Sequence, residues 1–534
     1  MDFIKRLFRH EKEKDNKQDD RGEGNRHLSK KLADNVALFK ETFKDCDDVV
    51  YRDFTVGDDQ RFKMTLIYID GMANKNLINE NILRSIMLDA RQTHPKTSDI
   101  QDIFELIKNS SLSTSDLKEI DDVDKIIVYV LSGLTLLLID GYDRGIIFET
   151  RGWQTRSIAP PEAEMTIRGP QDSFVETLRI NTALVRRRIR DTRLKLKSVQ
   201  IGTRSKTDVI IAYIEDIADE NVLEEVKNRL KTINIDAVLE SGYIEQLIED
   251  CWYSPFPQIE ITQRPDKVAA ALYEGRVSVL VDNSPFALLM PATVSVMIQS
   301  PEDYYMRWPI ASVIRLLRFL SIFIELYLPA LYIAITSYNP GMIPTTLSLY
   351  IAATRATVPF PSFIEAFMMM GVLEILREGG IRLPTPVSQT LGIVGAIVIG
   401  SAAVQAGIVS PFMVIVVAIT AMASFVVPNY SLSLSMRLLT FGFMIMATVF
   451  GLYGIYIGTI LMLSHMVILK SFGVPYIASF MSYTSRDLAD IVVRFPLHFM
   501  RYRPMFLQQK DKVRFDDKRE EKIKSREAGQ DDKK

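Results

Sequence analysis

The apolar residues of this 534-residue chain are concentrated in its second half, from about residue 310 to residue 465. Stretches of about 20 mostly apolar residues are typical of transmembrane helices. Four stretches approach this pattern, and the third is shorter but is bounded by prolines. The pattern predicts an all-α polytopic bundle within a membrane domain of residues 285–481. The predicted spans are Val313–Thr336, Val387–Ile408, Phe412–Val427 and Leu438–Leu463.

Two other apolar stretches in this region are not clean spans. The segment Pro285–Ile298 is short and contains a proline, which favours an interfacial or re-entrant segment. The segment Pro361–Glu378 has its charges on one face, as expected for an amphipathic helix at the membrane surface or packed on the bundle. Glu365 falls on the apolar face of this helix. Because Ser362 and Glu365 have the spacing of a capping box, we expect this acid to cap the helix start.

The first half of the chain has the composition of a soluble protein and contains an internal repeat. The segment Tyr68–Asn76 resembles Tyr213–Asn221, and Gly133–Asp140 resembles Gly275–Asp282 in the same order. Each copy alternates apolar strands with helical patterns, which is typical of α/β units with a buried sheet. The repeat predicts two similar α/β lobes joined by a segment rich in proline and polar residues. The expected lobes are residues 43–151 and 158–284.

Four acids end the strands of the repeat: Asp70, Asp140, Glu215 and Asp282. They could form a ligand or metal site in each lobe, but short acidic side chains also suit the turn after a strand. Hydrogen bonding within the turn is the favoured interpretation, because the sequence has no phosphate loop, dinucleotide fingerprint or histidine-based metal motif. We therefore predict no metal site, no cofactor and no catalytic residue. The lack of a nucleophile–base pair predicts that the chain is not an enzyme.

Charge alters the interpretation mainly at the two ends. Residues 1–42 are predicted to be a disordered charged arm, and residues 482–534 a charged cytoplasmic tail. The first residues lack the apolar core of a signal peptide, and lysines and arginines follow the last span from Lys470 onward. We therefore expect both ends to face the cytoplasm.

The overall composition excludes some classes of protein. The net charge of −2 gives no reason to expect nucleic acid as a partner. A basic run from Arg186 to Lys197 has no aromatic platform for bases and is best interpreted as a solvated helix face; contact with anionic lipid or an acidic subunit is the alternative. Cys46 and Cys251 are the only cysteines, which excludes a disulfide framework.

The first predicted span contains an acid in its middle, Glu325. A carboxylate at that depth costs several kcal/mol unless it faces water or a partner. An ion path and an intersubunit contact are both open interpretations. Arg315 and Arg318, near the start of the same span, are expected to reach the cytoplasmic surface.

The second predicted span has a stripe of residues at helical spacing. The stripe is polar at both ends and apolar in its middle, and small residues beside it permit close helix packing. A ring of such helices would form a pore with wettable mouths and a valine constriction. The alternative is a tightly packed helix in a monomeric bundle. The pore-lining candidates are Thr390, Val394, Val398, Ser401 and Gln405.

Four stretches give the chain a family resemblance. They are Arg168-Gly169-Pro170 with the helix to Arg190, Ser254–Thr293, Val358–Pro384 and Ile393–Pro411. In these stretches the chain resembles the A subunit of the spore germination nutrient receptors (GerA-type) of endospore-forming bacteria, from about Phe43 to about Pro504. The two charged ends lie outside the resemblance.

The resemblance implies a subunit that senses germinants in the spore inner membrane, with a transporter-like B subunit and a lipoprotein C subunit as partners. It also implies a homo-oligomeric ring acting as a nutrient-gated cation channel that contacts membrane lipid. A related A-like subunit associated with dipicolinic acid release shares these motifs. A secondary transporter and a non-conducting membrane scaffold are the other open functions, although the repeat lies outside the membrane part, unlike that of most transporters.

Overall fold

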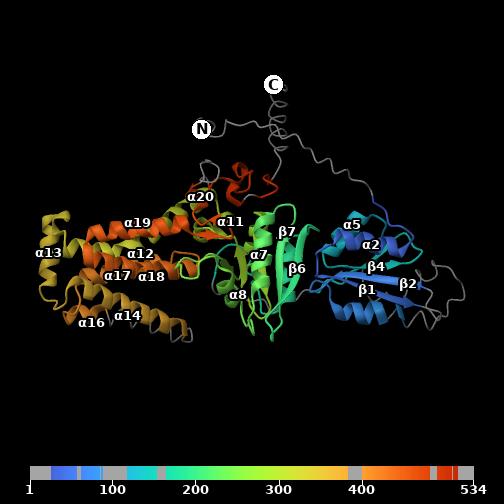
Figure 1. Cartoon of the computed structure of the whole chain (residues 1–534), viewed down its shortest axis with the longest axis horizontal. Helices are drawn as coiled ribbons and strands as arrows, with labels where there is room; N and C mark the ends of the chain where they lie inside the picture. Colours follow the sequence, from blue (N-terminus) through green and yellow to red (C-terminus); the bar gives the residue numbers. More distant parts are fainter. Residues whose placement is uncertain are drawn as a thin grey trace, which may run out of the picture.

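The computed structural model describes residues 26–56, 62–84, 86–87, 117–152, 164–382, 400–481, 490–507 and 509–514. Figure 1 shows two sheet-containing lobes and a helix bundle arranged in a row, with the second lobe in the middle. The chain is therefore mixed α/β in its N-terminal half and helical in its C-terminal half, as the sequence predicts.

The first lobe is an antiparallel five-stranded sheet of order β1-β2-β4-β5-β3. Apolar side chains from both faces of the sheet are buried, because α2 and α5 cover one face and η1 covers the other (Figure 1). Burial on both faces explains the continuous apolar strands. The elements are α2 (Leu32–Thr42), β1 (Val49–Val56), β2 (Phe62–Ile69), η1 (Leu77–Leu83), β3 (Leu117–Ile120), α5 (Val123–Leu131), β4 (Thr135–Ile139) and β5 (Gly145–Phe148).

The second lobe repeats this arrangement, with strand order β6-β7-β9-β10-β8. Its strands pair antiparallel and are also buried between helices. The elements are α6 (Leu178–Arg188), β6 (Leu194–Ile201), β7 (Thr207–Ile214), α7 (Glu220–Thr232), α8 (Ser241–Ile248), β8 (Glu260–Thr262), α9 (Pro265–Tyr273), β9 (Val277–Val281) and β10 (Ala287–Met290). The shared strand order is the one expected from a duplication.

The duplication extends to individual hydrogen bonds. Asp140 accepts from the backbone N–H of Leu32 at 3.0 Å, and Asp282 accepts from that of Leu178 at 3.1 Å. Leu32 and Leu178 are the first residues of α2 and α6. Because the first N–H groups of a helix lack partners within it, each acid stabilises the equivalent helix start. These two acids thus cap helix starts more than 100 residues away in the chain, which differs from the predicted hydrogen bonding within their own turns.

Two predicted boundaries are wrong. Residues 26–42 are not part of a disordered arm, because α2 inserts Leu32 and Phe39 into the core of the first lobe. The segment Pro285–Ile298 is not interfacial or re-entrant. It forms β10, a strand of the second sheet, and the short helix α10 (Val294–Ile298). Its apolar character arises because all four side chains of β10 are buried.

The lobes are joined through backbone pairing and one buried ion pair. Residues 45–47 pair with Leu196 at the edge of the second sheet, through the Leu196 N–Asp45 O and Asp47 N–Leu196 O hydrogen bonds. Beside this seam, the guanidinium of Arg186 donates two hydrogen bonds to Asp48, at 2.8 and 3.0 Å. Both side chains are at most 1% exposed. The first member of the predicted basic face is thus a buried interlobe contact.

The helix bundle packs α12 against α14, α17, α18 and α19 around an apolar core. Figure 1 shows α13 lying across the end of the bundle that is remote from the lobes. In the described ranges, α12 and α18 are long and apolar enough to cross a membrane, and α17 and α19 are shorter apolar helices. The helices are α12 (Trp308–Ser337), α13 (Thr345–Arg355), α14 (Ser362–Arg382), α16 (Gly400–Gln405), α17 (Pro411–Ser424), α18 (Tyr430–Phe450) and α19 (Leu452–Ile468).

The predicted span Leu438–Leu463 is wrong, because two helices occupy it. Gly451, at φ +61°, separates α18 from α19, and the two helices then pack against each other as a hairpin. This positive φ is costly for residues with a Cβ atom. Except for Pro361, the segment Pro361–Glu378 lies within α14, which is packed on the bundle with Ala366 and Met370 buried in its core.

Side-chain contacts define the helix directions. Ser337 at the end of α12 contacts Ser362 at the start of α14, with 2.5 Å between their hydroxyl oxygens. The Tyr338 hydroxyl, just after α12, donates to the Thr448 carbonyl near the end of α18. Thus α12 and α18 run away from the lobes, and α14 and α19 return toward them.

The predicted charged tail is not entirely separate from the rest of the chain, because residues 490–507 and 509–514 pack against α11 (Glu302–Tyr305), α12 and the second lobe. Arg503 donates to the Tyr273 carbonyl at 2.8 Å, and Gln509 donates to the Glu274 carbonyl at 2.9 Å. These carbonyls lie at the C-terminal end of α9, where a helix lacks internal donors. The charged and polar residues of this segment therefore serve as helix caps. Between the bundle and this segment lie β11 (Lys470–Ser471), β12 (Val474–Pro475) and α20 (Ala478–Met481).

Candidate functional site in the bundle and at its junction

The structure describes the predicted pore stripe only in part. Thr390, Val394 and Val398 lie outside the described residues. Ser401 and Gln405 are on α16, and both are exposed on the surface of the single chain. The described part of α16 has no buried residue.

Glu325 is buried in the interior of the bundle, with 1% of its surface exposed. Neither oxygen of its carboxylate accepts a hydrogen bond from the described residues. The Glu325 carbonyl accepts from the hydroxyl of Thr440 on α18, at 3.1 Å. A buried carboxylate without hydrogen bonds is costly, so this position calls for a functional explanation.

A compact group of charged residues lies within electrostatic reach of Glu325. Glu374 on α14 accepts from Arg377 at 2.9 Å and from Arg437 of α18 at 3.2 Å. Arg377 also donates to Ser424, the last residue of α17, at 2.8 Å. The four charged side chains come from three helices that are distant in sequence. Hydropathy alone did not predict their proximity.

Glu365 does not form the predicted capping box. Its carboxylate accepts from the backbone N–H of Ser410, the N-cap residue of α17. The Glu365 carboxylate also lies 3.8 Å from the guanidinium of Arg355. The Ser410 hydroxyl is 3.1 Å from the Tyr332 hydroxyl. The acid therefore joins the start of α14 to the start of α17. The local spacing was misleading because a tertiary donor competes with the helix start.

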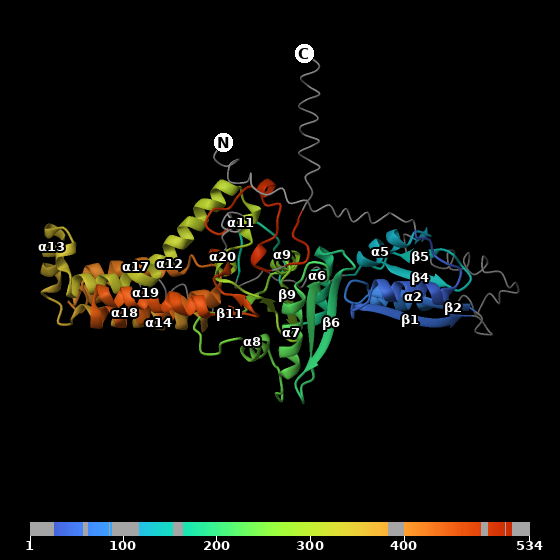
Figure 2. The same ribbon diagram turned by 45° about the horizontal axis from the view of Figure 1, so that its top comes forward.

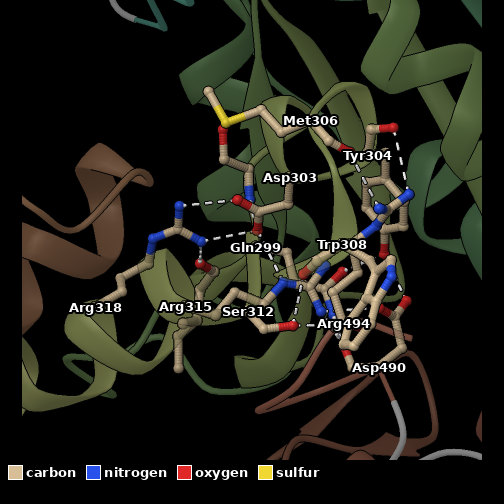
Figure 3. Close-up of polar contacts among 12 residues, drawn as sticks. Gln299, Asp303, Tyr304, Met306, Trp308, Ser312, Arg315, Arg318, Asp490 and Arg494 are labelled. Carbon is tan, nitrogen blue, oxygen red and sulfur yellow. Dashed lines mark hydrogen bonds and ion pairs between the residues drawn. The ribbon is translucent and has the colours of Figure 1, made fainter. Parts of the chain in front are cut away.

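A second charged group connects the bundle to the second lobe. Asp303, on α11 (Glu302–Tyr305), pairs with Arg315 at 2.9 Å and with Arg318 at 3.0 Å. Arg315 also pairs with Asp490 at 2.8 Å. Figure 3 shows the two arginines of α12 on either side of Asp303, with Asp490 approaching from the C-terminal segment. Arg315 and Arg318 are thus buried, not directed to the surface as predicted.

Aromatic and backbone contacts complete this junction. The Tyr304 hydroxyl donates to Asp490 at 2.6 Å. Arg494 donates to the Met306 carbonyl at 3.2 Å, and its guanidinium lies 5.6 Å from the Tyr304 ring centroid. Figure 2 shows α12 extending past the other bundle helices toward α11. The first turns of α12 are therefore held by the lobe and the C-terminal segment together.

A cavity of about 150 Å³ lies between the second lobe and α11. Three of its charged residues pair with one another: Glu260 is 2.5 Å from Arg276 and 2.8 Å from Lys267. Burial acts to raise the pKa of Glu260, but the two cations outweigh it and hold that pKa below its ordinary value. These ion pairs stabilise the lobe beneath the junction.

The remaining strand-terminal acids also pair within the chain. Asp70 lies at a cleft of about 390 Å³ between the lobes and is 2.9 Å from Lys75, and Glu215 is 3.4 Å from Lys195. Nowhere in the described ranges do three or more His, Cys, Asp or Glu side chains gather closely enough to hold a metal ion.

Comparison with known proteins identifies the family. Residues 37–506 match the model of the Bacillus/Clostridium GerA spore germination proteins. Spore germination protein B1 of Bacillus subtilis is 44% identical over 90% of this chain and 98% of its own length. The membrane protein YfkQ of the same organism, itself uncharacterised, is 42% identical over 90% of this chain and 92% of its own length.

One solved structure is similar to part of the chain. It is the N-terminal domain of the A subunit of the Bacillus megaterium spore germinant receptor GerK3. That domain is 35% identical, with a TM-score of 0.40, and the match covers 50% of this chain and 97% of the domain. The family match and the full-length relatives agree: this chain belongs to the GerA family of spore germination proteins.

Proposed function

We propose that the chain is a membrane subunit of a spore germinant receptor and that several copies form a nutrient-gated cation channel. Family membership supports the role in germination. The proposed partners are further copies of this chain, a transporter-like B subunit and a lipoprotein C subunit. The membrane would be the spore inner membrane.

The exposed face of α16 carries the channel proposal. Ser401 and Gln405 are polar and exposed on a bundle whose other exposed residues are largely apolar. A polar face is costly against lipid tails but not against water or a neighbouring subunit. If copies surround an axis with α16 facing inward, the preceding turns would bring Val394 and Val398 toward that axis. Valines there would exclude water in the closed state.

The helix directions support the proposed placement in the membrane. The chain leaves the lobe side in α12 and α18 and returns to it in α14 and α19, so both ends would lie on one side. Exposed basic residues Arg382 and Lys470 lie at the lobe-side ends of the bundle. Such residues favour the cytoplasm. The lobes and both termini would therefore be cytoplasmic.

Substitutions in the valine stripe test the channel directly. Val394→Ser and Val398→Ala should wet or widen the constriction, so spores should release cations without nutrient and spore yield should fall. Val394→Phe should block the nutrient response while the complex still assembles. Ile397→Ala, on another face of the same helix, is the matched control. If Ile397→Ala causes the leak and the valine variants do not, the stripe is wrongly oriented.

The other functions give different results in the same experiment. A scaffold conducts no ions, so no variant would alter cation release. A strict monomer in detergent would favour a transporter or a scaffold, whereas a ring of several copies would favour the channel. A subunit tied to dipicolinic acid release would alter release of that acid while the early nutrient-induced cation release stays normal.

A further inference from the structure

The loop between α8 and β8 exposes two adjacent aromatic side chains. Trp252 is 85% exposed and Tyr253 is 70% exposed. Their rings meet edge to face with centroids 5.7 Å apart. Large aromatic side chains that remain this exposed in one place mark a surface that contacts something else.

The base of this loop is held rigidly against the bundle. Phe256 is 2% exposed and packs in an apolar cluster with Met466 of α19. Ser254 and His465 are joined by a hydrogen bond of 2.9 Å. The Ser435 hydroxyl donates to the Pro255 carbonyl. The tip is therefore exposed although its base is fixed, so its exposure is not a property of a floppy loop.

The contacts locate the tip along the bundle. His465 lies three residues before the end of α19, and Ser435 lies five residues after the start of α18. At 1.5 Å per residue, the loop lies about 5–8 Å inside the lobe-side ends of these helices. At these ends Tyr430 is 56% exposed and Ile468 is 77% exposed. The aromatic tip thus continues the outward apolar surface of the bundle.

We propose that Trp252 and Tyr253 insert into the interfacial layer of the lobe-side membrane leaflet, which gives the second lobe its own attachment to lipid. This inference rests on the proposed membrane placement of the bundle. We infer that the tip contacts lipid because it lies beside the outward surface of α19, where Leu461 and Ile468 would face acyl chains. Tryptophan and tyrosine favour the membrane–water interface, where an apolar ring and a polar edge are both accommodated.

The lobe would then contact the membrane at two points. One is α12, which enters the bundle from the charged junction. The other is the aromatic tip beside α19. Two separate attachments limit tilting of the lobe relative to the membrane plane, so a movement of the lobe would be transmitted to the helices.

Tryptophan fluorescence in the full-length protein tests the attachment. The chain has three tryptophans, so Trp153→Phe with Trp308→Phe leaves Trp252 as the single emitter. The protein is reconstituted in vesicles of phosphatidylcholine and phosphatidylglycerol, with and without lipids brominated at shallow or deep acyl positions. We expect emission from Trp252 to shift to the blue on reconstitution and to be quenched most by shallow bromine. Aqueous iodide should quench it weakly.

Two further emitters, each in a background without other tryptophans, separate the possible failures. Leu461→Trp, on the outward face of α19, should be quenched by bromolipid if the bundle is in the membrane. Val128→Trp, exposed on the first lobe, should respond only to iodide. If Leu461→Trp is not quenched by bromolipid, the membrane placement itself fails. If Leu461→Trp is quenched but Trp252 responds only to iodide, the tip is in water and the proposal is overturned. Protection of Trp252 from both quenchers would mean that protein covers it, which also overturns the proposal.

Discussion

Replacing Asp48 by alanine should open the seam between the two lobes. The substitution leaves the guanidinium of Arg186 buried without its carboxylate, because Arg186 is fully buried in the seam. Two backbone carbonyls, of Asp191 and Leu194, still accept from it at 3.3 and 3.0 Å. They neutralise none of its charge. Removing one partner of a buried ion pair costs about 3–5 kcal/mol.

The native Cys46 thiol reports this opening. Cys46 is 6% exposed at the seam, with its sulfur 3.5 Å from the Leu194 carbonyl. A maleimide can reach it only when the lobes separate. Since about 1.4 kcal/mol corresponds to a factor of ten, the labelling rate should rise roughly 100- to 4,000-fold. The measurement uses a Cys251→Ser background.

Burial raises the pKa of the Cys46 thiol, and Asp48 and Arg186 also affect it. Each labelling rate is therefore divided by the rate for the same variant unfolded in denaturant. Dividing by this rate removes differences between the variants in the intrinsic reactivity of the Cys46 thiol in the unfolded chain.

Two further variants decide whether the buried charge is responsible. Lys197→Ala breaks another ion pair across the seam, to Asp45 at 3.4 Å, but the lysine side chain is 43% exposed. Exposed pairs contribute about 0–1 kcal/mol, so labelling should rise less than about tenfold. Asp48→Leu with Arg186→Met removes both charges and should be less destabilised than Asp48→Ala. The reasoning is refuted if Asp48→Ala labels no faster than Lys197→Ala, or if the double variant opens as readily as the single one.

Three further predictions concern the junction, the hairpin and the second lobe. Asp303→Ala leaves two buried arginines without their shared acid and should lower stability in detergent by about 3 kcal/mol, measured by thermal unfolding; an unchanged midpoint would show that Asp490 and the Ile298 carbonyl are sufficient to hold them. Gly451→Ala forces a Cβ into a positive-φ turn and should cost about 1–3 kcal/mol in the same assay, whereas the helical Gly442→Ala, with open space for a Cβ, should be neutral or stabilising. Burial, with two neighbouring glutamates, raises the pKa of Glu245 from 4.5 to about 7. The folded protein then binds this proton more tightly than the unfolded chain, so stability should fall as pH rises from about 4.5 to about 7. Glu245→Gln should flatten that fall in denaturant titrations, and an unchanged slope would contradict the assignment.

The repeat was predictable from sequence because its strands are buried on both faces and end in similar turns. The helix that begins the second lobe, α6, was predicted, but the equivalent helix of the first lobe, α2, was not. The start of α2 lies among charged residues, and its hydrogen bond to Asp140 spans 108 residues. Local pattern cannot reveal a cap supplied from that distance.

The bundle shows the corresponding limits of hydropathy. An apolar window treats Leu438–Leu463 as continuous, although one glycine at positive φ reverses the chain inside it. The place of Glu325 within a long apolar helix could be predicted because it depends only on position within an apolar run. The grouping of Glu374, Arg377 and Arg437 was not, because it depends on which helices become neighbours. The outcome at Thr390, Val394 and Val398 stays a prediction.

The C-terminal segment has a consequence for how the protein is made. The carbonyls at the end of α9 receive their caps from Arg503 and Gln509, and the Tyr273–Arg503 contact spans 230 residues. The second lobe therefore emerges from the ribosome before its last contacts exist, and the whole bundle must be synthesised first. The first lobe contains its own helix cap and needs no such wait. A ribosome that stalls after the bundle would release a chain with one finished lobe and one uncapped lobe. The second lobe can therefore be completed only after translation has passed the bundle.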